Sequence, residues 1–582
     1  MGCVSIDCLE WLSSLYNRCF KLLRCSFSKS SSPFNRRWRC RTKVAAQPFS
    51  VSSRNSFGYG QWLHGPGTEF ASGSICFGDI FITQATEFQK VWSTSDGANN
   101  GGVAFYKPVN LPRGFQSLGY LSFQNDGSFE GLVLVAMNNG NSYIPALSSP
   151  KGFTLVWSYI EGGTFSGPVY FWQPIPPDGY ASLGYVVTLT ADAPSLGEIA
   201  CVRVDLTDVC KLNAIAWETD TPSSFKVWNL IPTEIGADSL GVPVGAFGCG
   251  TDSSSNGICV GCLKNTSFML SGMPSREQLT SLINEYGPTI YFHPDEKYFP
   301  CSVSWFFGKS ILLFSRCQNI PITVSADGSN LPQGGSDDDE YWLDLPNDGT
   351  AHEVKRGSLA NATVYVHAKP MFGAAFTDIA FWLFYAFNGS ATAKLEVVNL
   401  SLGKIGEHVS DWEHVTLRIN NLTGKLSKVF FSQHSGGVWV NPADLEYAEG
   451  SRFVVYSSKS GHASYPKPGL VLQGDHGIGI RNDTAKSQYV LDSSQKFEFI
   501  SADYLGSENA PGEPVWLQYM RKWGPKIEYD LKQEIEKAIH KAPSVLRSKL
   551  RSLIKKLPDE VFGEEGPTGP KQKSSWMGDE KV

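Results

Sequence analysis

The sequence predicts a mostly β protein: an N-terminal β-repeat domain, then a jelly-roll-like β-sandwich, then short helices near the C-terminal end. The 57 glycines, 33 prolines and 13% aromatic residues suit short strands joined by tight turns. Aromatic and β-branched residues alternate in the repeated segments of the first half, which is the period of a strand. Residues 527–557 change to a helical period, and Pro543 divides them into two helices.

The length of 582 residues exceeds what one hydrophobic core needs, so we expect several domains. They are an acylated basic tail at 1–48, the β-repeat domain at 49–248, a linker with a short helix at 249–285, the β-sandwich at 286–525, and a helical end with a polar tail at 526–582. The net charge of -6 is small and no nucleic-acid-binding motif occurs, so we expect no nucleic-acid partner. The 13 cysteines are scattered, which predicts no disulfide framework and favours a reducing compartment.

The N-terminal tail carries the features of a lipid anchor. Gly2 becomes the N-terminus once Met1 is removed and is a myristoylation candidate, although Ile6 stands where the usual pattern has Ser or Thr. Cys3 and Cys8 are palmitoylation candidates. One myristoyl chain binds membranes only marginally, so a second signal is needed. The two cysteines can supply it, and so can basic residues that are attracted to anionic lipids. These basic residues are Arg18, Lys21, Arg24, Lys29, Arg36, Arg37, Arg39, Arg41 and Lys43.

We therefore expect the cytoplasmic face of a membrane, either the plasma membrane or an endomembrane such as the vacuole, with anionic lipids as partners. Two alternatives stay open. The Arg- and Ser-rich tail also suits an organelle transit peptide. A disordered tail without acylation would leave the protein in the cytosol.

The first half contains an internal repeat. Phe88–Trp92 matches Phe153–Trp157, and Pro112–Tyr120 matches Pro177–Tyr185, both at an offset of 65 residues. A third, more divergent copy begins at Trp217. Each copy reads as strand, turn, strand without catalytic chemistry, which is typical of a scaffold or docking surface. The string FWQPIPPDGYASLGYV resembles the repeat in the adaptor-binding region of vacuolar protein sorting 13 lipid-transfer proteins, which implies a trafficking adaptor as partner.

The second half holds long and unusual strings. They include YGPTIYFHPDEKYFPCSVSWFF, HVSDWEHVTLRI, FFSQHSGGVWV, YSSKSGHASYPKPG and WLQYMRKWGP. In this order they resemble the plant family named after vacuolar protein sorting-associated protein 62. The resemblance runs from about residue 49 to residue 571 and implies a role in vacuolar sorting or membrane trafficking.

The string HVSDWEHVTLRI predicts a strand with a polar end. Strand alternation places Asp411 and Glu413 on the face of three apolar residues, Val415, Leu417 and Ile419, which should be the core face. Buried carboxylates must be paired, hydrogen-bonded or bound to a metal. With His408, and with His434 approaching from a later turn, they are candidate ligands of a divalent cation: magnesium, calcium or manganese, with zinc left open by the imidazole. The alternative is a buried hydrogen-bond network, and His414 should project to the opposite face.

The same string resembles the central motif of necrosis- and ethylene-inducing-like proteins, secreted β-sandwiches that bind a divalent cation and plant sphingolipids. His408, Asp411, Trp412 and Glu413 match that motif, whereas Ser410 replaces its second histidine. SQHSGG matches a further string through Ser432, His434 and Gly436, and Asn388 is the nearest counterpart of an upstream metal aspartate. Asn388 and Trp412 are therefore candidate headgroup-binding or supporting residues, as is His462, which lies in a Gly-rich turn that could approach the same place.

Three functions follow as hypotheses. The first is a non-enzymatic peripheral membrane protein in vacuolar protein sorting or membrane trafficking, with a cation or lipid-headgroup site. The second is a metal-dependent hydrolase that uses Asp411 and Glu413. The third is a cation-dependent sphingolipid binder. No nucleophile elbow, phosphate loop, kinase motif or His-Glu-x-x-His occurs in the sequence, which favours a protein without catalysis.

The anchor gives the first testable prediction. Gly2→Ala should release the protein from membranes, because the chain is then no longer a myristoylation substrate. Cys3→Ser with Cys8→Ser should weaken retention, and cell fractionation measures both. A Gly2→Ala protein that still fractionates entirely with membranes would contradict acylation.

Overall fold

The computed structural model describes residues 49–50, 69–94, 102–124, 132–140, 142–160, 167–220, 222–251, 260–267, 270–336, 339–475, 477–526, 531–555 and 566–582. Gly2, Cys3 and Cys8 lie outside the described residues. The described chain is mostly β, as the composition predicts, with sheets of three to six strands and few short helices.

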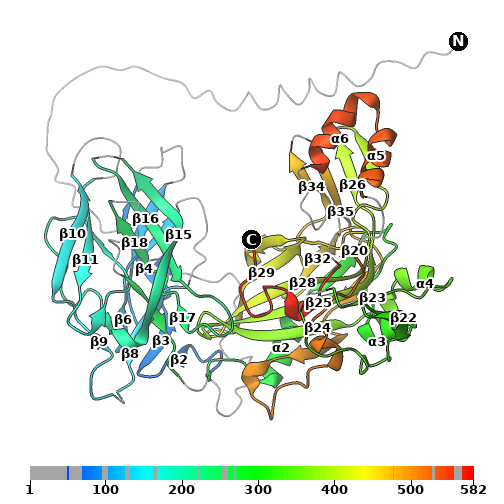
Figure 1. The fold of residues 1–582 in the computed structure, drawn as a ribbon. Coiled ribbons are helices and arrows are strands. Elements are labelled where there is room, and N and C mark those ends of the chain that lie inside the picture. Colours follow the sequence, from blue (N-terminus) through cyan, green and yellow to red (C-terminus); the bar gives the residue numbers. More distant parts are fainter. Residues whose placement is uncertain are drawn as a thin grey trace. The chain divides into compact units, whose positions relative to one another are not determined.

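The first half consists of small antiparallel sheets (Figure 1). Two four-stranded sheets come first: β1 (Phe49–Ser50), β4 (Glu87–Ser93), β5 (Val103–Pro108) and β7 (Leu121–Gln124), then β2 (Ser74–Cys76), β3 (Ile80–Gln84), β8 (Leu134–Asn138) and β6 (Gln116–Ser117). Two three-stranded sheets follow: β10 (Gly152–Tyr159), β11 (Val169–Ile175) and β13 (Val186–Thr188), then β12 (Tyr180–Ala181), β14 (Cys201–Arg203) and β9 (Leu147–Ser148). The last sheet is β17 (Gly241–Val242), β19 (Gly261–Lys264), β15 (Thr207–Thr219), β16 (Phe225–Pro232) and β18 (Phe247–Gly250).

The repeat is confirmed, including its third copy. Trp92, Trp157 and Trp217 each follow a register shift in the first strand of a hairpin: β4–β5, β10–β11 and β15–β16. A β-bulge increases the local twist and redirects a side chain. The three indoles meet in one aromatic core, where Trp217 lies 5.6 Å from Trp92 and 5.9 Å from Trp157 between ring centroids. The repeat thus builds a shared core from three equivalent hairpins.

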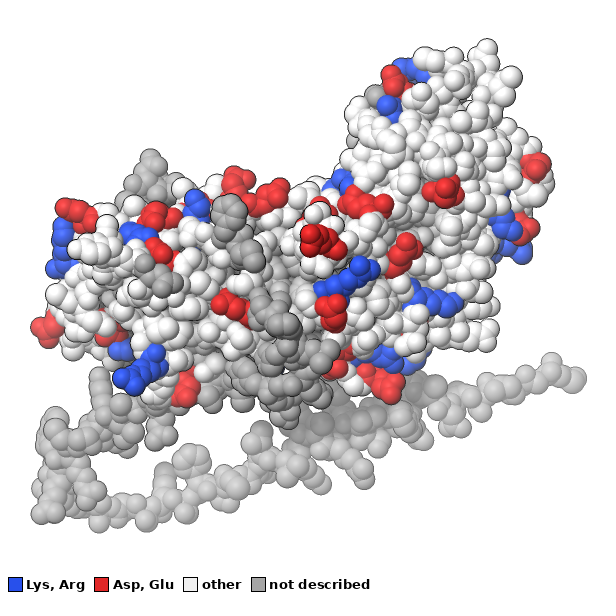
Figure 2. All heavy atoms as spheres, turned by 90° about the horizontal axis from the view of Figure 1, so that it is seen from below, with Lys and Arg blue, Asp and Glu red and all other residues white. Residues whose placement is uncertain are grey.

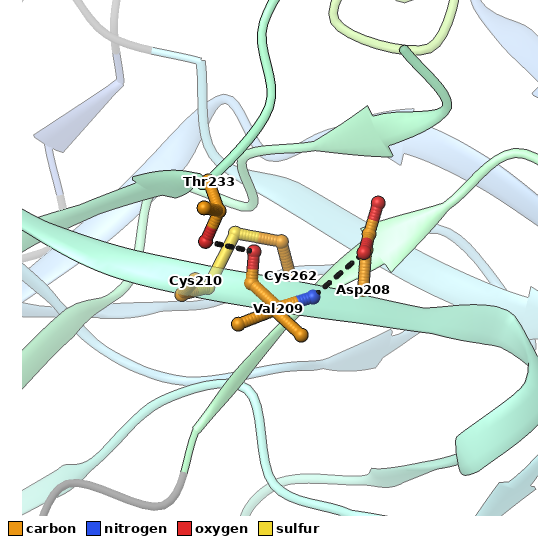
Figure 3. Close-up of a disulfide and its surroundings, with 5 residues drawn as sticks. All are labelled: Asp208, Val209, Cys210, Thr233 and Cys262. Carbon is orange, nitrogen blue, oxygen red and sulfur yellow. Dashed lines mark hydrogen bonds between the residues drawn. A yellow bond between two sulfur atoms is a disulfide. The ribbon is translucent and has the colours of Figure 1, made fainter. Parts of the chain in front are cut away.

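A disulfide joins Cys210 of β15 to Cys262 of β19, with a Cα–Cα distance of 5.6 Å (Figure 3). The expectation that the cysteines form no disulfide framework is therefore wrong at this pair. The two residues are 52 positions apart, but the antiparallel pairing of Asp208 with Cys262 brings Cys210, two residues further along β15, within bonding distance. A disulfide is at odds with the reducing compartment expected from the cysteine pattern, because cytosolic thiols are kept reduced.

The second half is a β-sandwich with additions. Its main sheet has the order β30 (Gly436–Val440), β29 (Lys425–Gln433), β28 (His408–Asn420), β25 (Phe376–Asn388), β24 (Val364–Met371) and β37 (Phe497–Ser501). The facing sheet contains β31 (Tyr447–Glu449), β32 (Arg452–Ser457), β20 (Thr289–Phe292) and β36 (Val490–Asp492), and β33 (Ser464–Tyr465) pairs with β32. Their core joins Val415, Leu417 and Ile419 of β28 to Phe292 and Phe453, so the predicted core face is confirmed.

Helix α2 (Arg276–Tyr286) packs Leu279, Leu282 and Ile283 into the same core. It begins after Ser275, whose hydroxyl accepts from the Gln278 N–H at 3.3 Å, while the Gln278 side chain accepts from the Ser275 N–H at 2.8 Å. The opposite face of the main sheet packs on α3 (Val303–Phe307) and on a sheet of β22 (Gln318–Thr323), β21 (Leu312–Ser315) and β23 (Tyr341–Asp344). The main sheet is covered on both faces, and every residue of β25 is buried. Helix α4 (Ala351–Lys355) lies near β25.

The predicted helical end forms α5 (Leu531–Lys541) and α6 (Arg547–Ile554), with Pro543 between them. They do not pack on the two sheets of the sandwich. Their apolar residues pack on a separate four-stranded sheet of β27 (Val398–Ser401), β26 (Thr392–Leu395), β35 (Ile478–Thr484) and β34 (Gly469–Asp475) (Figure 1). This sheet presents Ala393, Leu395 and Ile480 to the helices, so it supplies the apolar face that two short amphipathic helices need.

The disulfide gives a prediction about stability. Cys262→Ser should lower the free energy of unfolding by about 4 kcal/mol. The bond closes a loop between residues 52 positions apart and so restricts the unfolded chain. Denaturation of the oxidised protein measures the loss. Cys317→Ser is the matched control, since Cys317 is an exposed free thiol. Equal unfolding curves for wild type and Cys262→Ser would contradict the disulfide.

Candidate ligand-binding site

The site lies at the start of β28, where the strand departs from regular alternation. Ser410 has a φ of 60°, in the left-handed region that costs a residue with a side chain about 1–3 kcal/mol. Val409 and Trp412 consequently share one core on the same face, although they are three positions apart. The same irregularity brings His408 to the side of Asp411 and Glu413. His434, Ser460 and His462 also have positive φ values, so four strained residues surround this region.

Ser432 lies where the ladder between β28 and β29 ends. Val415 pairs with Phe431 in the last pair of this ladder, and the adjacent residues, His414 and Ser432, no longer form a ladder pair. The Ser432 hydroxyl accepts from the His414 N–H at 3.2 Å and donates to Glu413 Oε2 at 2.5 Å. One side chain therefore satisfies the backbone and holds a buried carboxyl.

His462 holds Asp411. Its Nδ1 lies 2.9 Å from Asp411 Oδ2, and its ring stacks on Tyr385 with centroids 3.8 Å apart. Burial raises the pKa of Asp411, but the His462 hydrogen bond and the positive charges nearby outweigh it and hold the pKa below its usual value. Asp411 is thus ionised at neutral pH, and Nδ1 of His462 is the donor.

The pKa of Glu413 is shifted in the opposite direction from that of Asp411. Burial and repulsion from Asp411 raise its pKa well above the usual value, and the Ser432 hydrogen bond and the Lys573 charge do not offset this. The two neighbouring carboxyl groups therefore differ in protonation: Glu413 carries a proton, whereas Asp411 is ionised.

His408 is a neutral imidazole that presents one nitrogen to the site. Burial lowers its pKa, although the negative charge of Asp411 acts in the other direction. Nδ1 lies 2.6 Å from the Ser410 carbonyl oxygen and must donate to it. Nε2 is then the acceptor.

These residues line a cavity of about 1060 Å³. Six of the seven predicted metal or headgroup residues line it. Besides Trp412 these are His408, Asp411, Glu413, His434 and Asn388. The seventh, the fully buried His462, lies behind Asp411. His434 Nε2 is 3.1 Å from Asn482 Oδ1, and Asn388 donates to the Gly406 carbonyl at 2.6 Å. His414 does project to the other face, as predicted, yet it also borders the cavity.

The arrangement does not fit a divalent cation as it stands. In the part of the chain that the structure describes, no three His, Cys, Asp or Glu side chains are placed to hold a metal ion. Asp411 Oδ2 is bound to His462, Glu413 Oε2 to Ser432, and the charge of Lys573 acts on both carboxyl groups. The cation stays a prediction, and no chemistry is derived through it.

The sequence pattern missed the contribution of the C-terminal segment, residues 566–582, which was expected to be a polar tail. Lys573 and Glu580 of this segment line the cavity. Glu580 Oε2 lies 2.9 Å from His414 Nε2, and Glu580 Oε1 accepts from Thr416 at 2.5 Å. No local pattern relates residues more than 150 positions apart, so periodicity could not find them.

Fold and site together define a β-sandwich protein with a polar cavity at the start of β28. The family described as vacuolar protein sorting-associated protein 62 matches residues 54–580, and the chain belongs to that family. No curated protein matches the chain.

Solved structures also match. GNIP1Aa from Chromobacterium piscinae is 18% identical, with a TM-score of 0.28, covering 36% of this chain and 41% of that one. This chain thus spans less than half the length of GNIP1Aa. Necrosis and Ethylene inducing Protein 2 from the agent of cocoa's Witches Broom disease is 13% identical, with a TM-score of 0.18, covering 32% and 67%. NLPPya in complex with glucosamine is 13% identical, with a TM-score of 0.21, covering 44% and 88%. At these TM-scores the matches carry no argument about the site.

The raised pKa of Glu413 predicts a pH dependence of stability. A carboxyl whose pKa is higher in the folded than in the unfolded state stabilises the fold fully below the unfolded value of about 4.3. This contribution is lost as pH rises through the folded pKa. Glu413→Gln keeps the neutral form at every pH, so its stability should fall less above pH 4.3. The difference is about 1.4 kcal/mol for each factor of ten by which the folded state binds the proton more tightly than the unfolded state.

Urea denaturation from pH 4.5 to 8 measures this difference. Asp411→Asn is the companion variant with the opposite sign. The depressed pKa of Asp411 stabilises the fold above the unfolded value, so its loss should destabilise most at neutral pH. Parallel pH profiles for wild type and Glu413→Gln would show that Glu413 is not protonated in the fold.

Proposed function

We propose that this chain is a non-enzymatic peripheral membrane protein in vacuolar protein sorting, and that its cavity binds a hydroxyl-rich lipid headgroup. The observation that carries the proposal is a large polar cavity in which most charges are paired within the protein. Membership of the vacuolar protein sorting-associated family supports the trafficking role.

Most of the charged side chains around the cavity occur in pairs. Arg481 Nη2 lies 2.6 Å from Asp483 Oδ1, and Lys459 Nζ lies 3.6 Å from Asp295 Oδ2. Asp411 and Glu580 pair with imidazoles. Paired charges leave donors and acceptors side by side without a strong field of one sign. Hydroxyl groups both donate and accept, so they suit such a surface better than an ion does.

Aromatic side chains support the wall of the cavity. Trp412 and Phe430 border it but are almost completely buried, so they hold the polar lining in place rather than contact a ligand. Inositol and glycosyl groups carry several hydroxyl groups, which suit this polar lining. We therefore favour an inositol lipid or a glycosylated sphingolipid.

Membrane attachment is assigned to the tail. In the described residues no helix is long and apolar enough to cross a membrane. The face in Figure 2 carries acidic and basic side chains interspersed rather than one basic region. Acylation of Gly2, Cys3 and Cys8 would supply the binding energy that such a surface does not. The β-repeats, with Tyr143 and Ile144 exposed, are the proposed contact for a trafficking adaptor.

Vesicle flotation tests the headgroup. Wild type should bind phosphatidylcholine vesicles that contain phosphatidylinositol or glucosylceramide better than phosphatidylcholine alone. His434→Ala and Asn482→Ala should each reduce the difference about tenfold, because each removes one partner of a hydrogen bond in the cavity wall. Glu449→Gln is the control, since Glu449 is an exposed partner of Arg452 outside the cavity lining. Equal binding to all vesicles, with and without divalent cations, would refute the headgroup site.

The unequal carboxyl groups favour a hydrolase as the second candidate. An ionised Asp411 beside a protonated Glu413 is the combination that acid–base catalysis uses. Incubation with glycoside and ester substrates, with and without divalent cations, tests it. Turnover that Asp411→Asn abolishes would establish the enzyme, and no turnover by wild type would dismiss it.

A further inference from the structure

The helix pair α5–α6 has a charge opposite in sign to that of the whole chain. Residues 531–555 contain seven basic residues and two acidic ones, whereas the net charge of the chain is -6. The basic residues are Lys532, Lys537, Lys541, Arg547, Lys549, Arg551 and Lys555, and all but Arg547 are exposed. The apolar residues of both helices pack on the sheet of β26, β27, β34 and β35. The helix pair thus buries an apolar face and turns a basic face to solvent.

Two exposed valines lie at one end of this helix-and-sheet module. Val545 lies in the turn between α5 and α6, and Val397 lies in the turn between β26 and β27. Their exposed fractions are 79% and 94%. Lys549, one helical turn after Val545, forms an ion pair with Glu396, the neighbour of Val397, which brings the two turns to the same end of the module (Figure 1). We call this end the tip: Val397, Val545 and the basic residues Lys541, Arg547 and Lys549.

The backbone of the tip is held by hydrogen bonds. The Glu396 N–H donates to the Gly477 carbonyl at 2.9 Å, which ties the β26–β27 turn to the neighbouring β34–β35 turn. The Arg547 guanidinium donates to the carbonyls of His540 and Ala542 at 3.2 Å each, so the start of α6 is bound to the end of α5. The fold therefore holds both valines in water, where their burial by a partner is favourable.

The acidic side chains of the helix pair do not neutralise its basic face. Both of them, Glu534 and Glu536, form exposed ion pairs with Lys537 and Arg551. Among the described residues, no ion pair includes Lys541. Basic side chains around exposed apolar ones suit the surface of an anionic leaflet, where the charges lie near phosphates and the apolar groups reach the interface. A nucleic acid would match the charge but leave the valines in water.

We propose that the tip is a second membrane-contact surface, which inserts Val397 and Val545 between the headgroups of an anionic leaflet. The inference rests on the proposed peripheral membrane role but not on the headgroup cavity. Strand β35 begins beside the tip, and its residues 480–483 line the cavity. Contact at the tip would therefore hold the cavity close to the leaflet. Together with an acylated tail it would bind at two places, so the tip itself needs only a modest affinity.

The test uses the full chain with Gly2→Ala, so that acyl chains do not dominate binding. Flotation compares vesicles of phosphatidylcholine with and without phosphatidylserine, an anionic lipid without inositol or sugar. Val397→Ser with Val545→Ser should weaken binding to the anionic vesicles about tenfold. Lys541→Gln should weaken it about fivefold and reduce its salt dependence. Ile320→Ser and Lys151→Gln are the matched controls, since Ile320 is 79% exposed on β22 and Lys151 is an exposed lysine of the first half.

Three results would overturn the proposal. The first is equal binding of the valine variant and its parent to anionic vesicles. The second is an equal loss of binding in the two controls, which would make the effect general. The third is duplex DNA binding that Lys541→Gln weakens while vesicle binding is unchanged, which would assign the tip to nucleic acid.

The cavity and the tip are separated by a further comparison. Phosphatidylinositol carries the same charge as phosphatidylserine, so an excess of binding to the inositol lipid reports the cavity and not the tip. His434→Ala should abolish that excess and leave binding to phosphatidylserine unchanged. Without any excess, but with binding to phosphatidylserine that needs the valines, the headgroup proposal fails and the tip stands.

Discussion

The structure of the second half depends on a buried charged face of the main sheet. Asp378, Lys369 and Arg418 are almost completely buried, and the apolar core lies on the opposite face of the same strands. A buried charge without a partner costs several kcal/mol. Asp378 satisfies part of Arg418, but a second acid and two carbonyl groups come from residues 575–579. The C-terminal segment must therefore return to the sheet for this face to be buried.

The cavity follows from the same constraint. The ladder between β28 and β29 ends at Val415, so the first residues of β28 need partners from elsewhere. His462 and Ser432 hold the two carboxyl groups, and the C-terminal segment brings Glu580 and Lys573 alongside. The result is a set of polar side chains around a space large enough for a headgroup. Positive φ values at Ser410, His434, Ser460 and His462 show that the backbone accepts strain there, as is common at functional sites.

Much of this was predictable from local patterns. Alternation places Val415, Leu417 and Ile419 in the core, and the 65-residue repeat identifies Trp92 and Trp157 as equivalent positions. The motif around Asp411 locates the site, but its chemistry depends on residues that no spacing connects. His462 follows 51 positions later, and Lys573 follows more than 150 positions later from a region that reads as a polar tail. The Cys210–Cys262 disulfide was missed because pairing depends on strand register, which a scattered cysteine pattern does not reveal.

The central claim is that the C-terminal segment is an integral part of the sheet's polar face. Hydrogen–deuterium exchange of the native protein tests it directly. The Trp576 N–H donates to Lys573 and the Gly578 N–H donates to Ser574, next to groups that are buried against the sheet. The account predicts that peptides covering residues 573–580 exchange about as slowly as those from β25 and β28. Complete exchange of this segment within seconds, while β25 and β28 stay protected, would contradict it.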